Sequence, residues 1–384
     1  MKKFKKLILY FLIFCSLFIN SGCWNYREME DSAIVTAAAI DKHKDKYVLT
    51  LEMLRPSPGF KESQVETVVF SDDGKTIFEA ARKIIRRAGR KPYWNHNMAI
   101  IFSKSIAQEG IAPALDWFRR DSETRSTVSV FISKDGFAKD IIMQSLVTTR
   151  RIVGIELNDT MKNQGISLRY PRVDLRHFRS TISSENISAT APFVGLEVKH
   201  GKTDILVSGT AVFKGDKLVG SLNDYETFPY LIIEEKVKKG LIVAENVGEQ
   251  SSNVALEIFN IKKQLNFSSD QDRYIIKGYF NFTTAIDEIS GTDDVIDEKM
   301  RAALIQKEEH EMKIRLEEVV KKVQTQYNAD IFGFGRIIEM QNPKLWKSMG
   351  ENSDAIFDKI NFQAEVKIHI KGSGRQSKPI KVGK

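Results

Sequence analysis

The chain has 384 residues, of which 42% are hydrophobic and 28% are charged, a composition typical of a globular protein with enough apolar material for two or three domains. The formal net charge is +8 at pH 7, but four lysines lie within the first six residues, and their removal would leave +4. So small an excess, without a nucleic-acid-binding motif, argues against nucleic acid as a partner and favours contact with anionic lipid or wall polymer.

The first residues have the layout of a secretory signal. An uncharged apolar run follows the four lysines and is too short to span a membrane comfortably. Ser21 and Gly22 then precede Cys23, as in a lipoprotein processing site, although Asn20 stands where an apolar residue is usual. We therefore expect a lipoprotein signal peptide over residues 1–22, cleavage between Gly22 and Cys23, and a diacylglyceryl group on Cys23. An uncleaved anchor helix or an ordinary signal peptide would leave the folded part outside the same membrane.

Cysteine usage supports the same interpretation. Cys15 lies within the apolar run, and Cys23 is the only other cysteine of the chain. After processing and acylation the mature chain would hold neither a free thiol nor a disulfide, so a lone cysteine at its N-terminus indicates anchoring. Apart from this covalent lipid we expect no cofactor and no metal.

The next part of the chain alternates between strand and helix patterns. Apolar runs and period-two alternation predict strands, whereas apolar residues at helical spacing predict helices. The predicted strands cover residues 32–40, 47–53, 65–70, 96–102 and 127–132, and the predicted helices cover 76–88, 106–119, 137–144 and 151–163. Together these elements predict an N-terminal mixed α/β domain over residues 23–190.

The helix predicted at 76–88 combines an apolar face with a basic one. Ile77, Ala80, Ala81, Ile84 and Ile85 share the apolar face. The basic cluster consists of Arg82, Lys83, Arg86, Arg87, Arg90 and Lys91. A solvated helix face with cations at its negative end is the favoured interpretation, and a patch for a membrane surface or an acidic partner is the alternative.

A Ser/Thr-rich stretch over residues 176–191 suggests the main domain boundary. Beyond it we expect a C-terminal β-rich region over 191–371, which could divide into two subdomains, and a basic flexible tail over 372–384. Residues 294–327 contain neither Gly nor Pro and carry an apolar stripe, which predicts one long amphipathic helix. Packing of this helix on a sheet, with Leu316, Val319, Val320 and Val323 buried, is favoured over binding to a partner or membrane. The predicted fold class is α+β, multi-domain, with mixed sheets and helices.

Several short motifs are spread along the mature chain. They are Cys23-Trp24-Asn25-Tyr26-Arg27-Glu28, an apolar strand that closes on Ile40-Asp41, a hairpin over 209–220, Asp330-Ile331-Phe332-Gly333-Phe334-Gly335, and Pro343-Lys344-Leu345-Trp346. In these motifs the chain resembles the Ger(x)C family of spore-germination lipoproteins, the C subunits of germinant receptors.

The resemblance implies a function and a location. It implies a non-catalytic, lipid-anchored subunit of a spore germinant receptor, needed for the germination response to nutrients. The implied partners are two integral-membrane receptor subunits and membrane lipid, and the implied location is the outer face of the spore inner membrane. Neither the nutrient nor direct binding of it by this subunit follows from the sequence.

A search for catalytic motifs finds little. The six histidines lack metal-ligand spacing, and His310-Glu311 is followed by Ile314 where a zinc protease has its second His. Gly333 and Gly335 lack the third glycine of a dinucleotide fingerprint, and no nucleophile elbow or P-loop occurs. We therefore expect no enzyme activity. The many acidic residues leave one alternative, a pair of catalytic carboxylates as in a glycosidase. The alternative function is a lipid-anchored solute-binding protein or a cell-wall hydrolase; the former should contain two similar lobes of strand–helix units.

The residues after Cys23 are the remaining candidates for a site. Trp24 and Tyr26 have apolar bodies with polar edges, which suit a membrane interface, and Arg27 can meet a lipid phosphate or a partner carboxylate. With Glu28 they are candidate membrane or partner contacts. The alternative is that they only extend the N-terminal strand.

Overall fold

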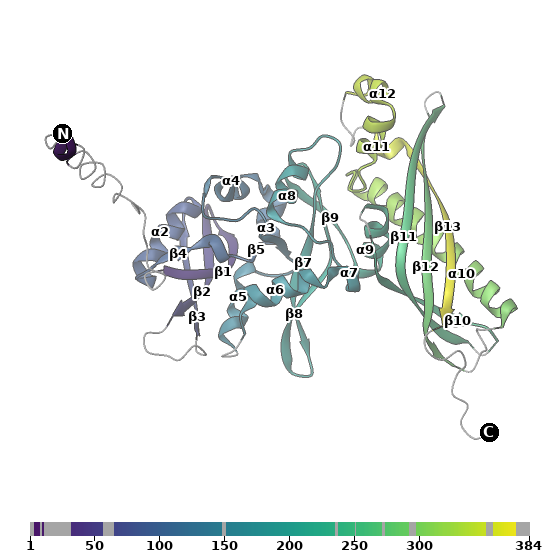
Figure 1. Ribbon diagram of the computed structural model, residues 1–384, viewed down its shortest axis with the longest axis horizontal. Helices are drawn as coiled ribbons and strands as arrows, with labels where there is room; N and C mark the ends of the chain where they lie inside the picture. The colour runs from purple at the N-terminus through teal and green to yellow at the C-terminus, as the bar shows by residue number, and fades with distance from the viewer. Residues whose placement is uncertain are drawn as a thin grey trace.

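A computed structural model describes residues 4–7, 10, 32–56, 65–147, 151–234, 237–249, 251–270, 273–291, 297–350 and 356–373. Cys23, Trp24, Tyr26, Arg27 and Glu28, most of the predicted signal peptide and all but the first two residues of the predicted tail lie outside these ranges. The described part contains two mixed sheets with helices packed on both, which confirms the predicted α+β fold class (Figure 1).

The first sheet has the strand order β3-β2-β1-β5-β6-β7-β8-β9, and β4 pairs with the start of β1. Its strands are β1 (Ser32–His43), β2 (Lys46–Pro56), β3 (Val65–Gly74), β4 (Lys91–Tyr93), β5 (Ala99–Phe102), β6 (Ser129–Ser133), β7 (Thr190–Lys199), β8 (Lys202–Lys214) and β9 (Lys217–Leu222). The central strands β1, β5, β6 and β7 are parallel, and antiparallel hairpins flank them. Parallel strands are covered on both faces, which explains why all four residues of β5 are buried and apolar.

Helices cover both faces of this sheet (Figure 1). One face carries α2 (Ile77–Ala88), α3 (Lys104–Glu109), α4 (Ala112–Arg120) and α8 (Leu175–Ile182). The other carries α5 (Ala138–Met143) and α6 (Val153–Lys162), followed by the short α7 (Gln164–Ser167). Short 3-10 turns, η2 (Trp94–His96) and η3 (Gln144–Leu146), complete the unit. The helix predicted at 76–88 is confirmed: Thr76 caps it by accepting a hydrogen bond from the Glu79 amide, and its apolar face is buried.

Two buried carboxylates of the first sheet hold helix N-termini. Asp41, at the end of β1, accepts hydrogen bonds from the amides of Ala138 and Lys139 at 2.7 and 2.9 Å, at the start of α5. Glu52 on β2 accepts from the amides of Val153 and Gly154 at 2.7 and 2.9 Å, at the start of α6. The unsatisfied amides and the positive dipole end of each helix thus offset the burial of a negative charge.

The approach of α6 to the sheet also needs a glycine. A Cβ at Gly154 would lie 2.2 Å from the carbonyl oxygen of Thr36 on β1. Thr36 itself donates its hydroxyl to the Glu52 carboxylate at 2.6 Å. Strand, carboxylate and helix start are therefore packed as one block with no room for a larger residue at 154.

The second unit is a four-stranded sheet crossed by one long helix (Figure 1). The strands are β10 (Gly240–Val247), β11 (Ser252–Asp270), β12 (Arg273–Ser290) and β13 (Ile360–Ser373); the helices are α9 (Asp224–Glu234), α10 (Glu298–Gln326), α11 (Phe334–Gln341), α12 (Pro343–Ser348) and the 3-10 turn η4 (Phe357–Lys359). The long helix predicted over 294–327 is confirmed as α10, capped by Asp297. Leu316, Val319, Val320 and Val323 are buried as predicted.

Helix α10 also covers the edge of its sheet. Among the described strands β13 pairs only with β12, so its outward amides need other acceptors. Glu317 accepts from the Ala364 amide and Glu309 from the Ile368 amide, both at 3.0 Å. The edge is thus protected against pairing with another chain.

The two units meet through a shared core. Leu168 and Leu222 of the first unit belong to the same apolar cluster as the α10 stripe. Tyr327, after α10, lies against Gly220 of β9, where a Cβ would come within 2.2 Å of its ring, and its hydroxyl donates to the Ser221 carbonyl at 2.9 Å. Lys322 pairs with Glu226 of α9 at 2.8 Å.

The change of sheet comes later in the chain than the boundary predicted between residues 190 and 191, because β7, β8 and β9 continue the first sheet and the chain leaves it only after Leu222. The Ser/Thr-rich stretch before it contains α8 and a loop. One expectation needs correction: the helix predicted over 106–119 is two helices, because Gly110 has φ +137°, a positive value that favours glycine and ends α3.

The packing of α10 provides a test. Leu316→Ala removes a fully buried side chain facing the sheet, and we expect it to lower the free energy of unfolding by about 2–5 kcal/mol. Ile314→Ala is the matched control on the same helix, because Ile314 is 38% exposed. Denaturant unfolding of the full chain measures both variants. Equal midpoints for the two would contradict the burial of the stripe.

Candidate functional site

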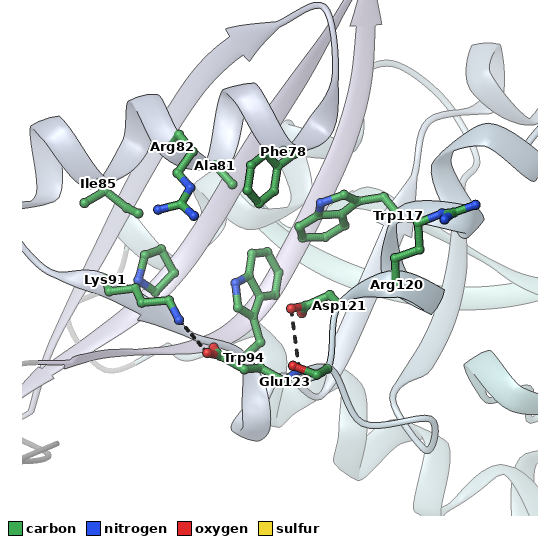
Figure 2. A pocket seen from close by; sticks show the side chains of 12 residues that line it. Phe78, Ala81, Arg82, Ile85, Lys91, Trp94, Trp117, Arg120, Asp121 and Glu123 are labelled. Carbon is green, nitrogen blue, oxygen red and sulfur yellow. Dashed lines mark hydrogen bonds and ion pairs between the residues drawn. The ribbon is translucent and has the colours of Figure 1, made fainter. Parts of the chain in front are cut away.

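A pocket lies beside the point where the described chain enters the first unit. Ser32, at the start of β1, pairs with Lys91 of β4, and Lys91 lines the pocket. The pocket has a volume of about 520 Å³ and lies between α2, β4, η2 and the end of α4 (Figure 2). The N-terminal residues that carried the predicted site precede β1 in the sequence and lie outside the described ranges. The pocket is a candidate site at the end of the unit where β1 begins.

Aromatic rings form the apolar wall of the pocket. Trp94 and Trp117 meet edge to face with ring centroids 5.1 Å apart, and Phe78 stands above them (Figure 2). Trp94 is 5% exposed and fixed by packing, whereas Phe78 is 54% exposed. Ala81, Ile85 and Pro92 complete the apolar surface. Such a wall offers ring faces to an apolar or aromatic group.

Some of the charged residues around the pocket form ion pairs with other described residues, and others do not. Lys91 pairs with Glu123, and Arg120 pairs with Asp116 on its own helix at 2.6 Å. Asp121 accepts a hydrogen bond from the Thr124 hydroxyl at 2.6 Å. Arg82 has no hydrogen bond or ion pair to any described residue; its guanidinium lies 4.9 Å from the centroid of the Phe78 ring.

Four members of the basic cluster predicted on α2 fall into two groups. Lys83 binds Asp73 of β3 as well as Glu79 on its own helix, and Arg87 donates to the Ser71 carbonyl, so these two hold α2 against β3. Arg82 and Lys91 instead line the pocket. No direct signal in the sequence indicates the pocket, because Trp94 and Trp117 could equally have been core residues. The helical spacing of Phe78, Arg82 and Ile85 was the one clue.

The family-like motifs that the structure describes hold the fold. Asp41 caps α5, as described above. Asp330 accepts hydrogen bonds from the amides of Phe334 and Gly335, at the start of α11, at 3.1 and 2.7 Å. Gly333, which lies between Asp330 and Phe334 in the sequence, has φ +70°. Trp346 is buried in the second core. These motif residues therefore specify turns and caps.

Buried acids elsewhere do not converge on one site. Burial raises the pKa of Asp41, against the lowering effect of its two amide bonds. Burial, with a smaller effect from Glu311, raises the pKa of Glu308 on α10 to about 7, and Arg315 and Lys307 lower it. Glu308 is 1% exposed, and its Oε1 has no hydrogen-bond partner in the described ranges.

Two further features bear on function. Within the described ranges, no group of three or more His, Cys, Asp or Glu residues is placed to hold a metal ion. None of the described helices is long and apolar enough to cross a membrane.

Two family models match the chain. The model described as spore germination protein N-terminal domain matches residues 25–196, and the model described as spore germination B3/GerAC like, C-terminal, matches residues 208–374.

Curated proteins and a solved structure are similar over most of their length. The chain is 25% identical over 410 residues to spore germination protein KC of Bacillus subtilis strain 168, with 98% of both chains covered. It is 24% identical to spore germination protein B3 of the same organism, with 96% of this chain and 98% of that one covered. The crystal structure of the GerBC protein matches with a TM-score of 0.54 at 18% identity, over 87% of this chain and 96% of that chain. This last match concerns the fold alone.

The buried Glu308 provides a test of pH dependence. Its pKa is about 7 in the folded chain and about 4.5 ordinarily, so the folded state binds the proton more tightly. Below pH 4.5 both states are protonated and the stabilising effect is complete; it is lost as pH rises through 7. We therefore expect Glu308→Gln to gain roughly 2–3 kcal/mol of stability relative to the wild type between pH 4 and pH 8.

Unfolding midpoints of the full chain at several pH values measure this difference. Glu318→Gln, at an exposed position of the same helix, is the control and should follow the wild type. A constant difference between Glu308→Gln and the wild type across the range would contradict the buried, titrating carboxyl group.

Proposed function

The chain belongs to the GerAC family of spore germination proteins, and from this premise we propose that it is the lipid-anchored, non-catalytic subunit of a germinant receptor, needed for the germination response to nutrients. Family membership supports a role in spore germination. The observation that carries the proposal is the extent of the match, which begins at residue 25, two residues after Cys23, and reaches residue 374.

In this proposal Cys23 carries the anchor. Eight residues separate Cys23 from Ser32, the first residue of β1, and they can span at most about 30 Å. The end of the first unit with α2 and β4 would therefore face the bilayer. Trp24, Tyr26, Arg27 and Glu28 would lie between lipid and body, where they contact the membrane or a partner subunit.

The proposed partners are two integral-membrane receptor subunits and membrane lipid, on the outer face of the spore inner membrane. The names of the relatives support the spore setting. The two units of the chain differ: one is a mixed sheet with helices on both faces, and the other a four-stranded sheet crossed by one helix. This difference argues against the alternative of a solute-binding protein with two similar lobes.

Replacing the anchor residue tests the proposal. Cys23→Ala removes the thiol that would receive the diacylglyceryl group, and we expect loss of acylation, loss of membrane attachment and a strongly reduced germination response, with the body still folded. Metabolic labelling with a fatty-acid analogue and membrane fractionation measure the first two effects. Cys15→Ala, within the predicted signal, is the control. Equal labelling of Cys23→Ala and the wild type would refute the lipid anchor.

A second test addresses the residues between the lipid and the body. A flexible Gly/Ser linker of about fifteen residues after Glu28 would separate them from β1 while leaving acylation and folding intact. We expect a slower germination response to nutrients. The same linker inserted after Gly374 is the control. A fully responsive strain would show that tethering suffices and that the docking surface lies elsewhere on the body.

A further inference from the structure

The pocket between α2 and α4 has hydrogen-bond donors without acceptors. The side chains of Arg82, Trp94 and Trp117 form no hydrogen bond to a described residue, although each lines the pocket. Arg82 reaches from α2 toward the space between Trp94 and Lys91 (Figure 2). A guanidinium and two indole N–H groups only donate. A ligand that satisfies them must bring acceptor atoms.

The acidic residues of the pocket are already engaged. Glu123 pairs with Lys91, and Asp121 accepts from the Thr124 hydroxyl and, at 3.5 Å, from the Glu123 amide. The lining contains three cations and two anions, a local excess of one positive charge. Arg82 is the lining cation that lacks an ion pair within the described ranges. The acceptor atoms of the ligand should therefore carry a negative charge.

The apolar wall of the pocket indicates the chemical character of the rest of the ligand. The rings of Phe78, Trp94 and Trp117 and the side chain of Ile85 offer no acceptor, so an apolar or aromatic body would pack there. A volume of about 520 Å³ lies within the usual range for small-molecule sites, roughly 300–1,000 Å³.

We propose that this pocket binds a small organic anion, in which a carboxylate or phosphate contacts Arg82 and an apolar or aromatic body packs against Trp94 and Trp117. The site lies on the described body, so it stands whether or not Cys23 is acylated. Such an anion could be a soluble metabolite or the headgroup of an anionic lipid, because both offer the same chemistry to Arg82.

The test uses the full chain in a non-ionic detergent and 3-phenylpropanoate as the probe. Trp94 and Trp117 line the pocket, so binding should change the tryptophan fluorescence saturably. 3-Phenylpropanol has the same body without the charge, and propanoate has the charge without the ring. We expect each of them to bind at least tenfold more weakly than 3-phenylpropanoate.

Two variants locate the site. Arg82→Gln should weaken binding of 3-phenylpropanoate about tenfold, because it removes a charge-assisted hydrogen bond. Arg86→Gln makes the same charge change on the same helix outside the pocket and should leave binding unchanged. Equal weakening by both variants, equal binding of the alcohol, or no saturable signal from the folded wild type would each overturn the proposal.

Vesicles distinguish the two sources of the anion. Phosphatidylglycerol vesicles that displace 3-phenylpropanoate from the wild type, while phosphatidylcholine vesicles do not, would identify a lipid headgroup as the source. Displacement by neither, with the Arg82 dependence intact, would identify a soluble anion.

Discussion

The first unit depends on carboxylates that are buried in the sheet and hydrogen-bonded to the first amides of helices. An ionised carboxylate costs several kcal/mol to bury without partners. For Asp41 and Glu52 the helix amides offset part of that cost, because α5 and α6 begin directly on them. The contact also acts in the other direction, since it fixes where each helix starts against the sheet. Asp330 repeats the device at α11, in the second unit.

These contacts order the elements around the pocket. β1 carries Asp41 at one end and pairs at its start with β4, whose Lys91 lines the pocket. Its neighbour β2 carries Glu52, so β1 and β2 are held from the α5–α6 face while α2 and α4 pack on the other. The pocket side chains thus stand on elements with little freedom, which favours a preformed site over one that must be ordered on binding.

Local patterns predicted the parts of this fold that are local. The helix at 76–88 follows from an apolar stripe within thirteen residues, and α10 follows from the stripe that includes Leu316 and Val323. The Glu52–α6 contact could not be predicted, because its partners are about a hundred residues apart and a glutamate in an alternating strand resembles any solvent-facing residue. The pairing of β7 within the first sheet could not be predicted for the same reason, because the sequence of an apolar strand does not show which strands it pairs with. The pocket joins residues from 78 to 123, and only the folded chain brings them together.

The family-like motifs within the described residues stabilise the fold. Contacts with partners would therefore be made by other residues, on the surface of the chain. Under the proposed function, the anchored segment after Cys23 and the adjoining end of the first unit provide such a surface. The most direct measurement is affinity purification of a tagged full chain from spore membranes, followed by identification of what accompanies it. We expect two integral-membrane proteins in constant ratio to the chain. Recovery of an acylated, folded chain without them would contradict its role as a receptor subunit.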